Sequence, residues 1–201
     1  MARRIPIVGT VEISLLTLLL TWQAARIVPT LAHNPWNLML LVGDALPVAF
    51  ILFRRSPLLI SRSPADWTTA FFGTVAPLLL APGGHPLAPA LPCAALMTIG
   101  LLLNIYAKCS LSLSFGLVAA NRGVQCKGPY RVVRHPMYTG YTLTQLGFLL
   151  LNPSLANMVL CAAALGFQVV RMGAEEKILT QDSAYRDYAA GVPFRLLPGV
   201  Y

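Results

Sequence analysis

Charged side chains are scarce in this 201-residue chain, and acidic ones are the scarcest: Asp and Glu together number 7, and all charged residues make up 11%. An ordinary soluble domain carries roughly a quarter charged residues. Hydrophobic residues reach 56%, and the mean hydropathy is positive at +0.66. This composition excludes a typical soluble domain and predicts an all-α, polytopic membrane protein.

Cysteine and histidine are also few, and their placement excludes a metal-binding motif. The four cysteines form no CxxC pair and no metal-type arrangement with histidine, and His33 and His85 stand alone in connecting segments. Sites built from these residues need several of them at short, regular spacing. We therefore expect buried, reduced thiols and no bound metal.

Six apolar segments stand out, although several are shorter than the ~20 residues that cross a bilayer upright. They are approximately Ile7–Val28, Trp36–Phe53, Trp67–Ala81, Ala88–Ala107, Met137–Leu151 and Leu155–Met172. Pro77 lies in the third segment, where it predicts a kinked or only partly inserted helix. The sequence therefore predicts five or six membrane-spanning helices in one domain, the last two joined as a tight hairpin.

The net charge of +8 is explained by membrane topology and does not require a nucleic-acid partner. With six spans and the N-terminus inside, fourteen of the fifteen Lys and Arg residues lie on the inner side, and only Arg26 lies outside. This is the distribution of the positive-inside rule. We expect both termini in the cytoplasm, a retained signal anchor after Arg3 and Arg4, and basic loops at anionic lipid headgroups. The compact, basic chain suggests a prokaryotic inner membrane.

Three inner segments differ in character from the apolar ones. The segment Lys108–Arg134 is a long loop without obvious structure of its own, which is typical of functional or disordered segments. The segment Glu175–Ala190 is amphipathic and is expected to lie along the inner membrane face. The tail Val192–Tyr201 is expected to be extended, because two prolines forbid a continuous helix.

The densest polar stretch, GPYRVVRHPMYTG at residues 128–140, leads directly into an apolar segment. Pro136 suits the first turn of a helix, which places Arg134 and His135 at the helix N-terminus, where backbone N–H groups are unpaired. Such an end beside an arginine favours a carboxylate or a phosphate, and Tyr138 adds a hydroxyl or an aromatic face. Interfacial Arg and Tyr side chains without a ligand are the alternative; for the three residues together we favour a site.

A second polar cluster, Arg171 with Glu175 and Glu176, ends the last apolar segment. The adjacent glutamates point about 100° apart on a helix, and Arg171 can pair with Glu175 four residues later. Two carboxylates near a helix C-terminus oppose the macrodipole. A solvated helix end is the simple explanation, but this locally unfavourable arrangement favours a cationic ligand or a ribose.

These motifs together resemble the isoprenylcysteine carboxyl methyltransferase family. The resemblance covers roughly residues 110–201 and rests on the 128–140 run, Leu151-Asn152-Pro153, Arg171 with Glu175-Glu176, a Tyr-containing helix and the proline-flanked tail. It implies a membrane enzyme that uses S-adenosylmethionine on a lipophilic small molecule, a lipidated substrate or a membrane lipid. It further implies a catalytic half at residues 108–201. The resemblance does not cover residues 1–107, which we expect to select the lipophilic substrate.

The same resemblance implies roles for individual residues. Arg134 would lie near the methyl-accepting group and Arg171 would share the catalytic role, whereas Asn152 would be structural or would line the substrate pocket. The expected cofactor-binding residues are Tyr130, His135, Tyr138, Glu175 and Glu176.

Two other functions stay open. Sterol reductases share the RHP-x-Y-x-G element and a similar tail, so NADPH-dependent reduction is one alternative, although the Glu pair, the Gly-Pro-Tyr lead-in and the short chain favour methyl transfer. A non-enzymatic membrane adaptor is the other, and it predicts a solvated helix end and no cofactor pocket.

The expected mechanism is direct methyl transfer, in which the enzyme aligns the reacting groups and excludes water. A carboxylate acceptor is already ionised at neutral pH and needs no general base. Asp44, midway along the second apolar segment, is a candidate substrate-binding residue because charge is costly there; an Asp that is protonated, or hydrogen-bonded to Asn104 or a hydroxyl, is the alternative. The acceptor stays open among a prenylated cysteine, another isoprenoid acid, a phospholipid amine and a small thiol.

Overall fold

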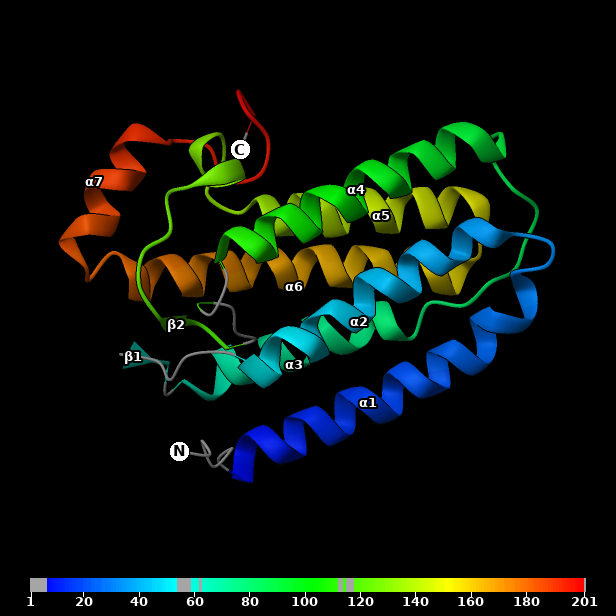
Figure 1. Cartoon of the computed structure of the whole chain (residues 1–201), viewed down its shortest axis with the longest axis horizontal. Coiled ribbons are helices and arrows are strands. Elements are labelled where there is room, and N and C mark those ends of the chain that lie inside the picture. The colour runs from blue at the N-terminus through cyan, green and yellow to red at the C-terminus, as the bar shows by residue number, and fades with distance from the viewer. Residues whose placement is uncertain (1–6, 54–58, 62, 112–113, 115–117, 201) are drawn as a thin grey trace.

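The computed structural model describes residues 7–53, 59–61, 63–111, 114 and 118–200, and most of these residues are helical (Figure 1). The α-helices are α1 (Ile7–Ile27), α2 (Leu38–Phe53), α3 (Pro64–Leu78), α4 (Ala90–Leu111), α5 (Pro136–Leu151), α6 (Leu155–Leu179) and α7 (Ser183–Gly191). The shorter elements are η1 (Val28–Thr30), η2 (Pro35–Asn37), β1 (Leu59–Ile60), β2 (Ala120–Asn121) and η4 (Gly128–Arg131).

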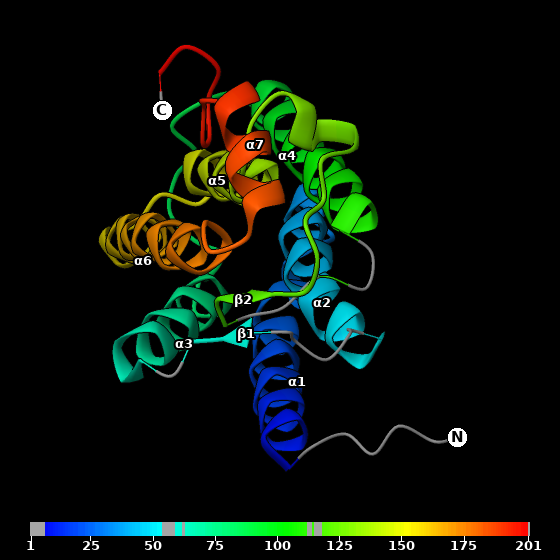
Figure 2. The same ribbon diagram turned by 90° about the vertical axis from the view of Figure 1, so that its left-hand side faces the viewer.

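Each of the six predicted apolar segments forms a helix, and these helices lie side by side in one bundle (Figures 1 and 2). The most extensive packing joins α4 to α5 and α3 to α6. Leu16, Met137 and Met172 belong to a buried cluster near one end of the bundle, and Leu40 and Phe148 to a second cluster farther along. The predicted helical membrane protein is therefore confirmed at the level of its helices.

The predicted number of spans is not confirmed. Within the described residues, three helical windows are long and apolar enough to cross a membrane, namely Ile13–Thr30, Ala90–Leu111 and Leu155–Leu179. Helices α2, α3 and α5 have 16, 15 and 16 residues. At 1.5 Å per residue these are no longer than ~24 Å, which is less than the ~30 Å hydrocarbon core.

One end of the bundle collects β1, β2, η4, α7 and the C-terminal tail, and we call it the site end (left in Figure 1, facing the viewer in Figure 2). The connections between α1 and α2, α3 and α4, and α5 and α6 lie at the opposite end, where Arg26 donates a hydrogen bond to the Leu79 carbonyl. This arrangement agrees with the predicted grouping of basic residues, whereas the orientation of the termini stays a prediction. Some of those basic residues lie outside the described ranges: Arg3, Arg4, Arg54, Arg55 and Arg62.

Two segments differ from expectation. The predicted amphipathic segment Glu175–Ala190 is not continuous, because α6 ends at Leu179 and α7 starts at Ser183 after a turn. Asp182 caps α7 by accepting a hydrogen bond from the Ala184 N–H at 3.0 Å, as Asp commonly does at helix N-termini. The predicted loop after α4 contributes β2, which pairs antiparallel with β1, and η4. Strands of two residues are too short for hydropathy periodicity to reveal.

Small residues bring α4 and α5 into close contact. A Cβ on Gly140 would lie 2.7 Å from the Gly100 carbonyl oxygen, and one on Gly100 would lie 2.6 Å from the Thr144 nitrogen. This approach lets the Asn104 amide donate to the Met137 carbonyl at 3.2 Å. The first turn of α5 is therefore fixed against α4.

We expect Gly140→Ala to lower the free energy of unfolding by about 1–3 kcal/mol, because the added methyl group overpacks the α4–α5 contact. Gly166→Ala is the matched control, since a Cβ there meets no atom within 4 Å and Ala is the better helix former by about 1 kcal/mol. Thermal unfolding of both variants in detergent measures the difference. Equal stability of the two variants would contradict the close packing.

Candidate functional site

The start of α5 is joined to the C-terminal tail by backbone hydrogen bonds. The Arg134 N–H donates to the Phe194 carbonyl at 2.9 Å, and the His135 N–H donates to the Arg195 carbonyl at 2.8 Å. The first N–H groups of a helix have no partner within the helix. The expected anion-binding end is therefore not open at these two groups, because the tail already uses them.

Glu176 fastens the tail to α6. Its Oε2 accepts two hydrogen bonds from the Arg195 guanidinium, from Nε at 3.0 Å and from Nη2 at 2.8 Å. Its Oε1 lies 3.1 Å from His135 Nε2 and 3.4 Å from Arg134 Nε. Glu176 is only 7% exposed. A paired geometry of this kind is among the stronger charge-assisted contacts, so Glu176 joins α6, α5 and the tail.

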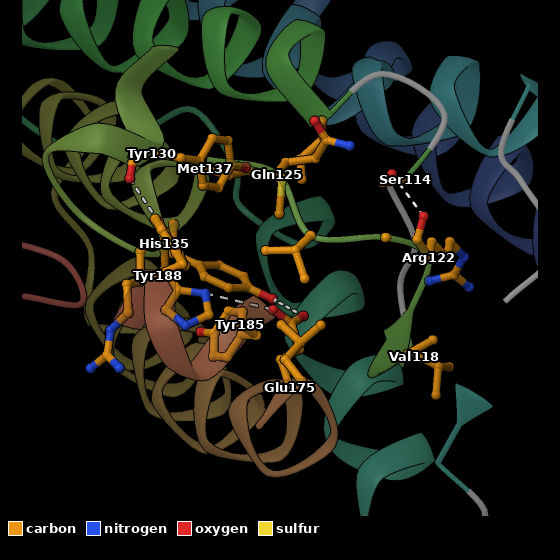
Figure 3. A pocket seen from close by; sticks show the side chains of 17 residues that line it. Ser114, Val118, Arg122, Gln125, Tyr130, His135, Met137, Glu175, Tyr185 and Tyr188 are labelled. Carbon is orange, nitrogen blue, oxygen red and sulfur yellow. Dashed lines mark hydrogen bonds and ion pairs between the residues drawn. The ribbon is translucent and has the colours of Figure 1, made fainter. Parts of the chain in front are cut away.

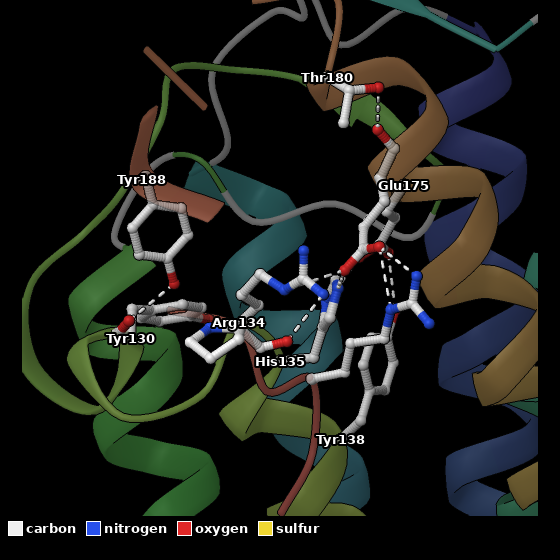
Figure 4. Close-up of polar contacts among 10 residues, drawn as sticks. Tyr130, Arg134, His135, Tyr138, Glu175, Thr180 and Tyr188 are labelled. Carbon is white, nitrogen blue, oxygen red and sulfur yellow. Dashed lines mark hydrogen bonds and ion pairs between the residues drawn. The ribbon is translucent and has the colours of Figure 1, made fainter. Parts of the chain in front are cut away.

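Glu175 has different partners from its neighbour. Tyr138 donates its hydroxyl proton to Glu175 Oε1 at 2.6 Å, and Arg171 Nε donates to the same oxygen at 3.2 Å (Figure 4). His135 Nδ1 lies 3.7 Å from Oε2. The Arg171 guanidinium also lies over the Tyr138 ring, 5.5 Å from its centroid. The two adjacent carboxylates therefore have different partners. Glu176 pairs with the tail, whereas Glu175 accepts a hydrogen bond from Tyr138.

A polar cavity opens at the site end beside Glu175 (Figure 3). The space between its walls is about 740 Å³ when the part open to solvent is included. Its walls combine aromatic rings with ionisable side chains: Tyr130, Arg134, His135, Tyr138, Glu175, Tyr185 and Tyr188. The walls of the cavity therefore offer both aromatic faces and charged groups to a ligand.

The buried hydroxyl of Tyr185 is a candidate ligand-binding group. Tyr185 is 4% exposed, and its hydroxyl has no hydrogen-bond partner among the residues that the structure describes. Burial raises the pKa of Tyr185, so the hydroxyl keeps its proton at neutral pH. The neighbouring Tyr188, whose pKa burial raises to about 12, donates to the Tyr130 carbonyl at 2.7 Å. An unpaired buried hydroxyl is costly, and a ligand in the cavity would satisfy it.

A segment that sequence reasoning did not single out covers one wall of the polar cavity. Residues 118–125 contribute Arg122 and Gln125 among others, and Arg122 is only 8% exposed. The Asn121 amide holds this segment to the α6–α7 turn by donating to Asp182 Oδ2 at 3.1 Å. The length of the loop was the one signal in the sequence that suggested function, and it could not identify the residues.

A second cavity, which we call the bundle cavity, lies among α1, α2, α3, α5 and α6. Its empty volume is about 540 Å³, including its open part. Asp44, Arg171 and Gln168 are its most polar lining residues, and Met137 and Tyr138 line both cavities. Tyr138 is 1% exposed. The two cavities are therefore neighbours across these two side chains.

The structure brings most of the predicted site residues together. Those that line the polar cavity are Tyr130, Arg134, His135, Tyr138 and Glu175. Arg171 and Asp44 line the bundle cavity. Glu176 does not line either of these cavities and contacts the tail. Within the described residues, no three His, Cys, Asp or Glu side chains gather as a metal-ligand set.

Asn152 lies apart from this cluster, at the opposite end of α5. Its amide donates to Asn37 Oδ1 at 2.9 Å, and its backbone carbonyl accepts from Asn157 Nδ2 at 2.7 Å. Helix α5 has 16 residues, so ~24 Å separates its two ends. Asn152 therefore lies away from the polar and bundle cavities, and its side chain joins the end of α5 to Asn37 and to the Gly83 N–H, as the structural alternative expects. Its contact with substrate stays a prediction.

Comparison with known families gives one match. Residues 91–186 match the family described as phospholipid methyltransferase. The matched range begins in α4, includes α5 and α6 and ends in α7. No curated protein matches the chain. The match confirms the resemblance to the isoprenylcysteine carboxyl methyltransferase-like integral membrane enzymes.

Removing the charge of Glu176 should release the tail. We expect Glu176→Gln to accelerate tryptic cleavage after Arg195 at least about tenfold, because cleavage follows the population of the open state. Glu175→Gln is the matched control, because Glu175 bonds to Tyr138 and Arg171 and not to the tail. Mass spectrometry of timed digests measures both rates. Equal protection in the two variants would contradict this role of Glu176.

Proposed function

We infer that this chain, which belongs through residues 91–186 to the phospholipid methyltransferase family, transfers a methyl group from S-adenosylmethionine to a lipophilic acceptor. The observation that carries the proposal is the pair of cavities separated by Tyr138 and Met137. One cavity lies at the site end beside Glu175, and the other lies among the helices of the bundle. A water-soluble cofactor and a lipid acceptor need two such environments side by side.

The residues of the polar cavity fit S-adenosylmethionine. This molecule combines a sulfonium and an ammonium group with a carboxylate, a ribose and an aromatic base. Glu175 offers a carboxylate to a cationic group or to ribose hydroxyls, and Arg122 offers a cation to a carboxylate. The Tyr185 hydroxyl, which has no partner among the described residues, can donate to the ligand, and the rings of Tyr130 and Tyr188 offer aromatic faces to the base.

When bound, the cofactor supplies a methyl group that is already activated by its positively charged sulfur. The protein then has to align the acceptor and exclude water. Tyr138 is suited to this task, since it is buried between the cavities and its hydroxyl is fixed on Glu175.

We assign the orientation of the acceptor to Arg171 in preference to Arg134. Arg171 lines the bundle cavity, where the acceptor lies in this proposal. Arg134 lines the polar cavity and donates to the Pro193 carbonyl at 3.2 Å, so its side chain also holds the tail. Replacement of Arg171 is accordingly expected to affect the acceptor more strongly than replacement of Arg134.

The contacts of the carboxylate pair argue against a non-enzymatic adaptor. An adaptor predicts glutamates at a solvated helix end, whereas Glu176 is buried and Glu175 lines a cavity. Reduction with NADPH shares the tail and the 134–140 element with methyl transfer, and binding measurements separate the two.

Titration calorimetry of the purified protein in detergent tests the cofactor. We expect S-adenosylmethionine and its demethylated product to bind and NADPH not to bind. Glu175→Gln should raise the Kd of S-adenosylmethionine about tenfold or more, as expected for a lost hydrogen bond to a charged group. Asp187→Asn, at an exposed position of α7, is the control with an unchanged Kd. If only NADPH bound, the methyltransferase proposal would be wrong and the reductase alternative would be supported.

Tyr185→Phe separates a role in binding from a role in stability. Because the Tyr185 hydroxyl has no partner among the described residues, its removal should leave the melting temperature unchanged or higher. It should raise the Kd of S-adenosylmethionine roughly 3- to 10-fold. Tyr188→Phe, which loses a hydrogen bond to Tyr130, should instead lower the melting temperature. A Tyr185→Phe variant with unchanged affinity would contradict the assignment.

A further inference from the structure

We propose that the bundle carries a further binding site, at the end opposite the polar cavity, for the neutral, hydroxyl-rich headgroup of a membrane lipid. The site is a cavity among the α1–α2, α3–α4 and α5–α6 connections, which lie together at one end of the bundle (Figure 1). The space between its walls is about 830 Å³ when the part open to solvent is included. We call it the opposite-end cavity. No described residue lines both this cavity and either of the other two, so the proposal does not depend on methyl transfer.

Neutral side chains dominate the wall of the opposite-end cavity. Among its described residues, His33 is the one ionisable side chain, and none is Asp, Glu, Lys or Arg. The other polar side chains are amides, a hydroxyl and an indole, from Thr30, Asn34, Trp36, Asn37 and Asn152. A phosphate or a carboxylate would lose part of its hydration without meeting an arginine or a lysine, and an ammonium would meet no carboxylate. The wall therefore disfavours ions of either sign and favours a neutral polar group.

Hydrogen bonds fix this wall before any ligand binds. The Gly83 N–H donates to Asn152 Oδ1 at 3.3 Å, and Asn152 Nδ2 donates to Asn37 Oδ1 at 2.9 Å. Asn37 Nδ2 then donates to Thr30 Oγ1 at 3.3 Å. Asn37 is 1% exposed and Asn152 is 4% exposed. Since a preformed wall lowers the ordering cost of binding, the three connections present one fixed surface to a ligand.

Asn34 lacks the partner that its position would ordinarily give it. It lies at the N-cap of η2, where an Asn side chain commonly accepts a hydrogen bond from the first N–H groups, but its side chain makes no capping bond. Its Oδ1 is buried and has no hydrogen-bond partner among the residues that the structure describes. An unpaired buried acceptor is costly. A ligand that donates an O–H in the cavity would satisfy it, which an ionised phosphate or carboxylate cannot do.

Apolar groups beside these polar ones favour a sugar or glycerol headgroup that belongs to a lipid. The half-buried Trp36 side chain offers an apolar face to the C–H groups of a polyol and an N–H donor to its hydroxyls. Leu38, Leu87 and Leu91 are exposed, and each directly follows a residue that lines the cavity. Exposed apolar side chains of this kind mark contacts with a membrane. A headgroup in the cavity can therefore keep its acyl chain on the apolar surface of the helices.

The fluorescence of Trp36 tests the site, because Trp36 is the one of the three tryptophans that lines the cavity. Trp22→Phe combined with Trp67→Phe leaves it as the sole reporter in the full-length protein, held in phosphatidylcholine nanodiscs. Octyl glucoside carries a neutral polyol, and octylphosphocholine carries charged groups on the same chain. We expect octyl glucoside to change the Trp36 emission with saturation, at a Kd at least about tenfold below that of octylphosphocholine.

Asn34→Ala should raise the Kd of octyl glucoside roughly 3- to 10-fold. It should leave the melting temperature unchanged or higher, because it removes an unpaired acceptor. Gln181→Ala, at an exposed position of the turn between α6 and α7, is the control with an unchanged Kd. A protein that keeps only Trp22, which lies in α1 and does not line the cavity, separates binding in the cavity from partition into the bilayer.

Equal affinity of Trp36-reporting protein for the two amphiphiles would overturn the proposal, and so would an unchanged Kd in Asn34→Ala. Should the tryptophan variants not fold, titration calorimetry of the wild-type protein with the same two amphiphiles still decides between the headgroups. Glucose, which has no chain, distinguishes the sources of the polyol. Weaker binding of glucose than of octyl glucoside supports a lipid headgroup, whereas equal binding would overturn the assignment to a lipid.

Discussion

The adjacent carboxylates of Glu175 and Glu176 hold the site together, and most of its other features depend on them. They lie in the last turn of α6, where the helix dipole disfavours negative charge. Arg195 and Arg171 offset this cost, the first from the tail and the second from the preceding turn. Because neighbouring positions on a helix point about 100° apart, one carboxylate can fasten the tail while the other contacts Tyr138 and the polar cavity.

The two ends of the bundle use polar side chains for different purposes. At the site end, Arg122, Arg134 and Glu175 line the polar cavity, and Arg195 of the tail pairs with Glu176. At the opposite end, neutral amides close the connections: Asn157 donates to the Ala81 carbonyl at 2.8 Å, and Asn152 bonds to Asn37. Neutral amides satisfy backbone groups without the desolvation cost of a buried charge. Charge is thus concentrated where a ligand would use it.

The two halves of the chain contribute unequal parts. The matched range 91–186 contains all of α5 and α6 and most residues that line the polar cavity, but it excludes the tail that is hydrogen-bonded to the start of α5. Helices α1 to α3 line the bundle cavity together with α5 and α6, and α1 and α2 carry Gln23 and Asp44. The proposed function accordingly assigns the methyl-transfer chemistry to the C-terminal half and the choice of acceptor to residues before α4.

The sequence by itself determined the helical class, the position of six helices and the membership of the Arg134, His135, Tyr138 and Glu175 cluster. Hydropathy and the order of local motifs carry this information, because each depends on residues near one another in the chain. Only the tertiary structure separated the roles of Glu175 and Glu176 and placed Asn152 far from the site. It also ended α6 before α7, paired β1 with β2 and put residues 118–125 on the polar cavity. These features depend on contacts between segments far apart in sequence, such as the tail with α5 and α1 with α2, and no local pattern specifies such contacts.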